Sequence, residues 1–390
     1  MSTPGATAIA GLGLTDVGKV YDRTAGQFAA EAVRLAVADA GLAMADVDGL
    51  LVMSGLAKGV DLGLADTLGL SDLGLLAQIN AYGATAGAMV EYASMAVANG
   101  SVSAVACVFA DAPLRTGTSA GGAWTNYTTR GAATGLASLR AASGFSSAAA
   151  QYALAARRHM LRYGTTSAQL GAIAVAQRQW AQHNPHAQFR APITLADHQN
   201  SRMISDPLHL LDCCLVSNGG AAVIVTSAER ARDLRQPPAY VWGWGQGHPG
   251  YSGHRGSEFG LVTGAVQAGR TAMKMAGITP AEVTIREIYD CYTYTTLVTL
   301  EDYGFCTKGE GGPLAESGAL GPGGSLPTNT GGGQLSSYYL VGMTPLLEAV
   351  TQARGHGGAR QVENNNVILV SGNGGILAHH ATLVLSPQPR

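Results

Sequence analysis

Apolar runs and amphipathic segments alternate along much of the chain. Residues 24–42, TAGQFAAEAVRLAVADAGL, carry apolar side chains at helical spacing between a Thr and Gly41, a pattern that predicts a helix with both ends marked. The continuous apolar run SAVACVFAD, residues 103–111, predicts a strand covered on both faces. Further strands are expected in VDGLLVMS and LLAQIN, and a helix over residues 83–100. This alternation predicts an α/β protein with mainly parallel strands.

Residues 112–200 interrupt this pattern. Their first part, RTGTSAGGAWTNYTTRGAATGLASLRAASGF, is rich in Gly, Ser, Thr and Ala and predicts loops. Two helices are expected after it, in SSAAAQYALAARRHMLRYG and TSAQLGAIAVAQRQWAQHN. We interpret the segment as an excursion that covers one end of the sheet, where lids and substrate walls usually lie.

The early pattern then returns. Residues 32–47, AVRLAVADAGLAMADV, align without gaps to residues 268–283, AGRTAMKMAGITPAEV. Each copy predicts a helix, a Gly stop, a short turn and the start of a strand. The equivalent place of the two copies favours an internal duplication over chance, with RARDLRQPPAY as the linker between the halves.

Composition limits the classes of protein and partner. Hydrophobic residues make up 46% of the 390 and charged residues 13%, which predicts two closely packed halves in a compact or oligomeric protein and excludes a disordered chain. The net charge is −2 and no Lys/Arg run is present. Nucleic acid and anionic membranes are therefore not expected partners.

The cysteines and the N-terminus predict a cellular location. The five cysteines are irregularly spaced, which favours buried thiols in a cytosolic protein and indicates no metal site. The opening residues MSTPGATAIAGLGL lack the basic and apolar regions of a signal peptide. No apolar stretch of about 20 residues, the length that spans a bilayer, is present. We therefore expect a cytoplasmic protein.

Tyrosines gather in one short segment. EIYDCYTYTT, residues 287–296, contains three of them within six residues, although only 6% of the chain is aromatic. One Tyr would satisfy packing. The cluster favours either a pocket wall or a site that handles protons.

Several stretches resemble the thiolase superfamily, in its sterol-carrier-protein and lipid-transfer branch. They are the duplicated segment, DPLHLLDCCLVSNGGAAVIVTSAERA, EIYDCYTYTTLVTLEDYGFCTKGEGG and LPTNTGGGQLSSYYLVGMTPLLEAVTQARG. The resemblance implies a thiolase fold of five layers, αβαβα, in a homodimer. It implies one half from residues 1–111 with 201–234, a second half from 235–390, and an excursion over 112–200 that covers the active site.

The resemblance fails at the catalytic positions. A thiolase carries a nucleophilic Cys at the start of a buried helix, and that position falls on Gly83. The family's His-Asp-Cys-Phe becomes Tyr289, Asp290, Cys291 and Tyr292, and the His of its Gly-His-Pro falls on Tyr339. No Cys stands in VSGNGG, near the place of the C-terminal thiolase Cys. Claisen chemistry through an acyl-enzyme is therefore not expected.

These changes resemble the aldolase members of that branch. The resemblance implies a carbon–carbon lyase without a Cys nucleophile or a cofactor, acting on a coenzyme A thioester. It implies a steroid 17-hydroxy-20-carboxyl-CoA substrate that yields a 17-ketosteroid and propionyl-CoA. It also implies a small partner with a zinc-ribbon and an OB-fold domain, attached to a hydratase in some members.

Tyr289 and Tyr339 are the predicted acid and base. A free Tyr has a pKa near 10, so we expect the site to lower one phenol pKa, with Asp290, His379 and His380 as candidates to tune it. Residues expected to contact substrate are Tyr292, Tyr294, Tyr338, Asn329, Gly332, Gly333, Gly83, His379 and His380.

Other interpretations stay open. Tyr292 and Tyr294 also fit simple packing, and one of the adjacent His379 and His380 fits the core, because neighbours on a strand face opposite ways. His248, in GQGHPG, fits a loop with a Pro-Gly turn better than a catalytic base. Rival functions are an acyltransferase that uses Cys291 or a partner's thiol, and a non-catalytic subunit that carries lipid or stabilises a partner.

Overall fold

A mixed sheet forms the centre of the molecule. The computed structural model describes residues 4–121, 138–139, 142–144, 147–250 and 259–390. Among these residues, nine strands lie side by side in the order β3-β2-β4-β7-β1-β8-β11-β10-β9. They are β1 (Thr7–Leu14), β2 (Gly49–Ser54), β3 (Leu75–Gln78), β4 (Ala104–Asp111), β7 (Gly219–Ser227), β8 (Ala239–Gly247), β9 (Ile285–Glu287), β10 (Ile368–Gly374) and β11 (His379–Ser386). A separate small hairpin pairs β5 (Met203–Ser205) with β6 (Leu208–His209).

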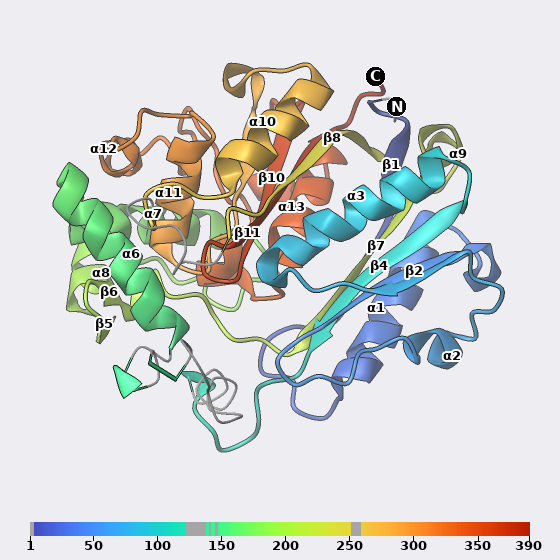
Figure 1. Cartoon of the computed structure of the whole chain (residues 1–390), viewed down its shortest axis with the longest axis horizontal. Helices are drawn as coiled ribbons and strands as arrows, with labels where there is room; N and C mark the ends of the chain where they lie inside the picture. Colours follow the sequence, from blue (N-terminus) through green and yellow to red (C-terminus); the bar gives the residue numbers. More distant parts are fainter. Residues whose placement is uncertain (1–3, 122–137, 140–141, 145–146, 251–258) are drawn as a thin grey trace.

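Helices pack on both faces of this sheet (Figure 1). Those of the described residues are α1 (Ala25–Ala40), α2 (Leu64–Leu68), α3 (Thr85–Ala98), α6 (Ala148–Tyr163), α7 (Ser167–Ala181), α8 (Leu195–Asn200), α9 (Ala228–Arg232), α10 (Ala265–Ala276), α11 (Thr293–Asp302), α12 (Gly311–Glu316) and α13 (Met343–Ala353). Helix α1 covers β1, β4 and β7, and α10 covers β8 and β11. Between the halves lie α3 and α13, which contact strands of both. The layers are thus α1, the strands of the first half, α3 with α13, the strands of the second half, and α10, which confirms the predicted five-layer arrangement.

The prediction of mainly parallel strands is wrong. Strand β2 runs parallel to β3 and β4, and β9 parallel to β10. The pairs β1–β7, β4–β7, β10–β11 and β8–β11 are antiparallel, and so is β1–β8, which joins the two halves. Hydrophobic periodicity identifies a strand but not its direction. Only a short connection links β10 to β11, and a short connection forces an antiparallel pair.

The duplicated segments form the same structure in both halves. Gly41 and Gly277 end α1 and α10 in the left-handed conformation, at φ 77° and 59°. A side-chain Cβ at Gly13 of β1 would lie 2.1 Å from the Ala32 carbonyl oxygen, and one at Gly245 of β8 would lie 2.5 Å from that of Ala268. Ala32 and Ala268 are aligned in the sequence repeat. Each outer helix therefore presses its backbone onto a strand where no side chain intervenes.

The excursion over 112–200 packs on the second half. Ser147 and Thr166 cap the starts of α6 and α7 with their hydroxyls. Helix α7 lies against α11, α12 and the segment Gly333–Ser337. Much of the predicted loop over residues 115–145 lies outside the described residues. The division into 1–111 with 201–234, 112–200 and 235–390 stays a prediction.

The hydrophobic core lies on both faces of the sheet. The larger cluster of buried side chains runs from β4 and α3 to α11, α13 and β10, and a second cluster fills the space between α1 and the strands β2, β4 and β7. None of the described helices has the length and apolar character needed to cross a membrane. The chain ends meet at one edge, where Gly5 lies against Arg390 (Figure 1).

Candidate active site

Two phenols meet where two segments of the second half come together. Tyr289 follows the end of β9, and Tyr339 follows Gly333–Ser337, a turn of π-helix. Their hydroxyl oxygens are 2.9 Å apart and hydrogen-bonded, and the two residues are separated by 50 positions in the chain. The tertiary structure thus brings together the two residues that the sequence singled out as acid and base.

Two buried polar side chains hold these segments in place. The Asn329 carbonyl oxygen accepts a 2.6 Å hydrogen bond from the backbone N–H of Ile288, and Asn329 adopts φ 54°, a conformation that Asn tolerates. The Asp290 carboxylate accepts from the backbone N–H groups of Gln334, at 2.9 Å, and Leu335, at 3.2 Å. The backbone on both sides of Tyr289 is therefore tied to the loop that leads to Tyr339.

The ring of Tyr289 fills the space that a nucleophile would need. Gly83 lies in a short 3-10 helix, Tyr82–Ala84, that leads into α3. A Cβ atom at Gly83 would lie 2.3 Å and 2.4 Å from ring carbons of Tyr289 and 2.1 Å from the Asn373 carbonyl oxygen. Real Cβ atoms do not approach so closely. The site therefore has no room for a Cys at the position where the thiolase resemblance places one.

The expectation that one phenol pKa is lowered is wrong. Burial raises the pKa of Tyr289 well above its usual value, and the hydroxyl of Tyr339 adds to this rise. Burial also raises the pKa of Tyr339, although its hydrogen bond with Tyr289 acts in the opposite direction. Both phenols are therefore neutral at pH 7. Between the two, the hydrogen bond favours placing negative charge on Tyr339.

Further aromatic side chains form a wall beside the pair. Tyr292, the first residue before α11, packs against Tyr152 of α6 with ring centroids 4.7 Å apart. Tyr152 is buried and lies near enough to the Cys291 thiol to influence its pKa. Tyr152 is not among the site residues predicted from the sequence. The helical spacing of Tyr152, Ala156 and His159 on the buried face of α6 is the signal that could have found it.

Tyr294 and Tyr338 lie away from the pair. Tyr294 is fully buried, donates to the Gly260 carbonyl and lies edge-on to His159. Tyr338 borders a cavity of about 10 Å³ together with Asn329, Gly333 and Glu348, a space that holds no more than one water molecule.

The glycines of the Asn329 loop allow close contacts. Gly332 and Gly333 adopt φ 93° and 59°. A Cβ at Gly332 would lie 2.5 Å from that of Ala181 in α7, and one at Gly333 would lie 2.2 Å from an Asp290 carboxylate oxygen. Glycine at these positions lets the loop pack tightly between α7 and Asp290.

The two adjacent histidines face opposite ways, as expected for a strand. His380 is buried, and its Nε2 contacts the Tyr303 hydroxyl at 2.8 Å and the Ser371 hydroxyl at 3.0 Å. Burial lowers the pKa of His380 to about 3. His379 stacks on Tyr82 and lies 3.0 Å from His248, measured between the two Nδ1 atoms. His248 is thus a direct neighbour of His379.

The thiols are poorly suited to nucleophilic attack. All five cysteines are free. Burial raises the pKa of Cys291 to about 12, and that of Cys213 to about 12 as well. A thiolate at either position is strongly disfavoured at neutral pH. Within the described part of the chain, no three His, Cys, Asp or Glu side chains gather as a metal site would require.

Comparisons with known proteins agree with this geometry. Residues 245–387 match the family model described as Thiolase C-terminal domain-like. The chain is 39% identical to a steroid side-chain-cleaving aldolase of Thermomonospora curvata, over 95% of this chain and 96% of that one. It is 40% identical to the 17-hydroxy-3-oxo-4-pregnene-20-carboxyl-CoA lyase of Mycobacterium tuberculosis, over 95% and 97%.

A solved structure extends the likeness to three dimensions. The structure named "Ltp2-ChsH2(DUF35) aldolase" superposes with a TM-score of 0.87 at 38% identity, over 98% of each chain. Identity at this level along nearly the whole length reflects common descent rather than a shared architecture alone. The chain therefore belongs to the thiolase superfamily, in its sterol-carrier-protein and lipid-transfer thiolase-like group.

Proposed function

We propose that this chain is a carbon–carbon lyase that cleaves the Cα–Cβ bond of a β-hydroxyacyl-CoA thioester. Two relatives similar over nearly their whole length are named as a steroid side-chain-cleaving aldolase and a steroid carboxyl-CoA lyase. The proposed substrate is accordingly a steroid 17-hydroxy-20-carboxyl-CoA, and the products are a 17-ketosteroid and propionyl-CoA. The observation that carries the proposal is the hydrogen-bonded pair of Tyr289 and Tyr339 beside Gly83.

The pair supports a proton relay between neutral phenols. The β-hydroxyl of the substrate gives its proton to the Tyr339 oxygen, while Tyr339 passes its own proton across the 2.9 Å contact to Tyr289. The electron pair of the O–H bond becomes the new C=O bond. The Cα–Cβ pair moves onto Cα, where Tyr289 supplies the proton. No free phenolate is formed, which fits pKa values that burial has raised in both residues.

The rival based on an acyl-enzyme has little support. It requires a reactive thiol next to the thioester carbonyl. Gly83 offers neither a thiol nor room for one. Cys291 is buried and held in the thiol form by its raised pKa. The aldol cleavage proposed here needs no covalent intermediate.

We also propose an assembly and a location. The solved relative carries a second protein, designated ChsH2(DUF35), in its name, so a protein of that class is the proposed partner. A second copy of the chain is proposed to complete a homodimer. Strand β3 forms one edge of the sheet, and Leu76 on it and Tyr82 beyond it are 41% and 42% exposed. An open edge of this kind can pair with another chain. The proposed location is the cytoplasm.

The test is a product balance. The purified chain, alone and with a DUF35-class partner, is incubated with the steroid hydroxyacyl-CoA, and products are separated by liquid chromatography and mass spectrometry. The proposal predicts ketosteroid and propionyl-CoA in equal amounts. Hydrolysis to free coenzyme A and the intact acid, or transfer of the acyl group to added coenzyme A, would contradict it.

A further inference from the structure

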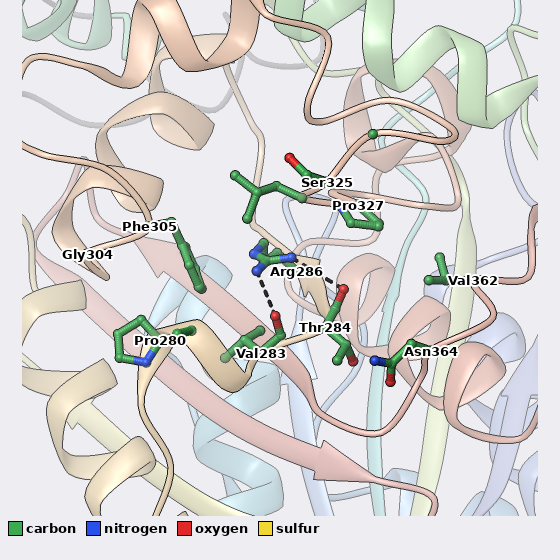
Figure 2. Close-up of a pocket in the computed structure, with 13 residues that line it drawn as sticks. Pro280, Val283, Thr284, Arg286, Gly304, Phe305, Ser325, Pro327, Val362 and Asn364 are labelled. Atoms are coloured by element: carbon green, nitrogen blue, oxygen red, sulfur yellow. Dashed lines mark hydrogen bonds between the residues drawn. The ribbon is translucent and has the colours of Figure 1, made fainter.

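A second cavity lies at the opposite end of β9 from the tyrosine pair. It has a volume of about 490 Å³ and opens beside the turn that precedes β9. Pro280, Phe305 and Pro327 supply apolar walls, while the exposed Ser325 and Asn364 lie at its rim (Figure 2). A cavity of this size accommodates a small organic molecule.

The floor of this cavity contains a buried cation. Arg286 of β9 lines it and is only 3% exposed. Its guanidinium donates to the Val283 carbonyl at 2.7 Å and to the Thr284 carbonyl at 3.3 Å, and lies 4.6 Å from the centre of the Phe305 ring (Figure 2). The Nε atom is buried and has no hydrogen-bond partner among the described residues.

The guanidinium also lacks a counter-charge. Among the residues that the structure describes, no carboxylate forms an ion pair with Arg286, and no Asp or Glu lines the cavity. Burial lowers the pKa of Arg286 to about 10, so the side chain remains cationic at pH 7. A buried charge is ordinarily paired, because its desolvation is costly. The charge of Arg286 therefore has no partner and its Nε–H has no acceptor among the described residues, although the side chain borders an open cavity.

We propose that this cavity binds a small molecule that carries a carboxylate or a phosphate on an apolar body. The oxyanion accepts hydrogen bonds from Arg286, whose planar donors suit both groups. The apolar body packs against Phe305, Pro280 and Pro327. The site is distinct from the proposed active site, because its lining surrounds the start of β9 whereas Tyr289 lies beyond its end.

The experiment is a titration calorimetry series on the whole chain in a buffer low in competing anions. Benzoate and phenyl phosphate are the anionic probes, and benzyl alcohol is the neutral one. We expect one equivalent of at least one anionic probe to bind, and benzyl alcohol to bind at least about tenfold more weakly. The anionic probe that binds more tightly shows whether a carboxylate or a phosphate is the preferred group.

Matched variants at the rim assign the site. Ser325→Glu adds a negative charge at an exposed position and is expected to weaken anion binding about tenfold or more, whereas Ser325→Gln, similar in size, leaves it unchanged. Arg286→Gln is expected to abolish binding in a chain that circular dichroism shows to be folded. The Ser325 pair keeps the test decisive if that variant does not fold. A Tyr289→Phe and Tyr339→Phe double variant should bind the probes like the parent.

Several outcomes would overturn the proposal. They are no binding of either anion at millimolar concentration, equal binding by Ser325→Glu and Ser325→Gln, and loss of binding in the double tyrosine variant. Inorganic phosphate binding as tightly as phenyl phosphate would refute the role of the apolar walls.

Discussion

At the scale of single residues, catalysis is assigned to two hydroxyl groups. Replacing Tyr289 or Tyr339 by Phe keeps the ring and removes only the oxygen that takes part in the 2.9 Å hydrogen bond. We expect kcat to fall by ~10²-fold or more for each variant, the usual contribution of a general acid or base. Steady-state kinetics of steroid-CoA cleavage measures this loss.

A matched control separates proton transfer from packing. Tyr240 of β8 is a buried Tyr in a small apolar cluster with Ala8, Ala10 and Ala231, remote from the pair in the described structure. Tyr240→Phe is expected to retain the parent rate. Parent-like rates in both active-site variants would instead show that the pair is a packing feature.

Gly83 is the other residue on which the proposed mechanism depends. Adding a Cβ there brings it within 2.4 Å of the Tyr289 ring and 2.1 Å of a backbone carbonyl. Gly83→Ala and Gly83→Cys are therefore expected to lower the free energy of unfolding by ~1–3 kcal/mol, the usual cost of overpacking, and to abolish cleavage. Urea denaturation measures the first effect.

The same measurement has a simple control. Leu161 of α6 is 80% exposed, so Leu161→Ala should leave stability close to that of the parent. If Gly83→Cys instead restored thiolase activity in a stable chain, the steric argument would be refuted.

At the scale of elements, the π-helical turn before Tyr339 depends on Asp290. Burial raises the pKa of this carboxyl to about 7 from 3.8, despite hydrogen bonds from Gln334 and Leu335 that act the other way. Between about pH 4 and pH 7 the folded chain keeps a proton that the unfolded chain has lost. Asp290 therefore stabilises the fold most at low pH, and this contribution declines as pH rises through that window.

Asp290→Asn removes this titration. The difference in unfolding free energy between parent and variant should fall between pH 5 and pH 7, by no more than ~1.4 kcal/mol per pH unit, and level off above. Denaturation at several pH values measures it. Tyr289→Phe serves as a control, because burial keeps that phenol neutral throughout the range. A difference that rises with pH would contradict the proposed environment of Asp290.

The elements also show what sequence alone could supply. The helix, Gly stop and turn of each half were predictable, because local spacing and end signals determine them. The aligned Ala32 and Ala268 turned out to touch glycines of β1 and β8 in the same way. Strand direction was not predictable, because it depends on which strands the sheet places side by side.

At the scale of the whole molecule, the site is partly predictable for a related reason. Tyr289 and Tyr339 could be predicted as acid and base because both stand at positions where the family has histidines. Helical spacing places Tyr152 on the buried face of α6, but its approach to the site is a result of tertiary packing that the sequence does not show. Tyr294 and Tyr338 lie in the same segments as the site residues, but their side chains contact other parts of the molecule. The spacing of residues along a segment shows which side chains share a face, but not what that face contacts. The unpaired charge of Arg286 is likewise a tertiary property.

The intact mass of the chain during turnover distinguishes aldol cleavage by the tyrosine pair from chemistry through an acyl-enzyme. A single-turnover mixture of the assembled enzyme and steroid hydroxyacyl-CoA is quenched at intervals, and protein mass and small-molecule products are recorded together. Cleavage by the tyrosine pair predicts an unmodified protein mass at every time, with ketosteroid and propionyl-CoA appearing together, and neither product from the Tyr289→Phe and Tyr339→Phe double variant. An acyl adduct that forms and decays at the rate of turnover would contradict it.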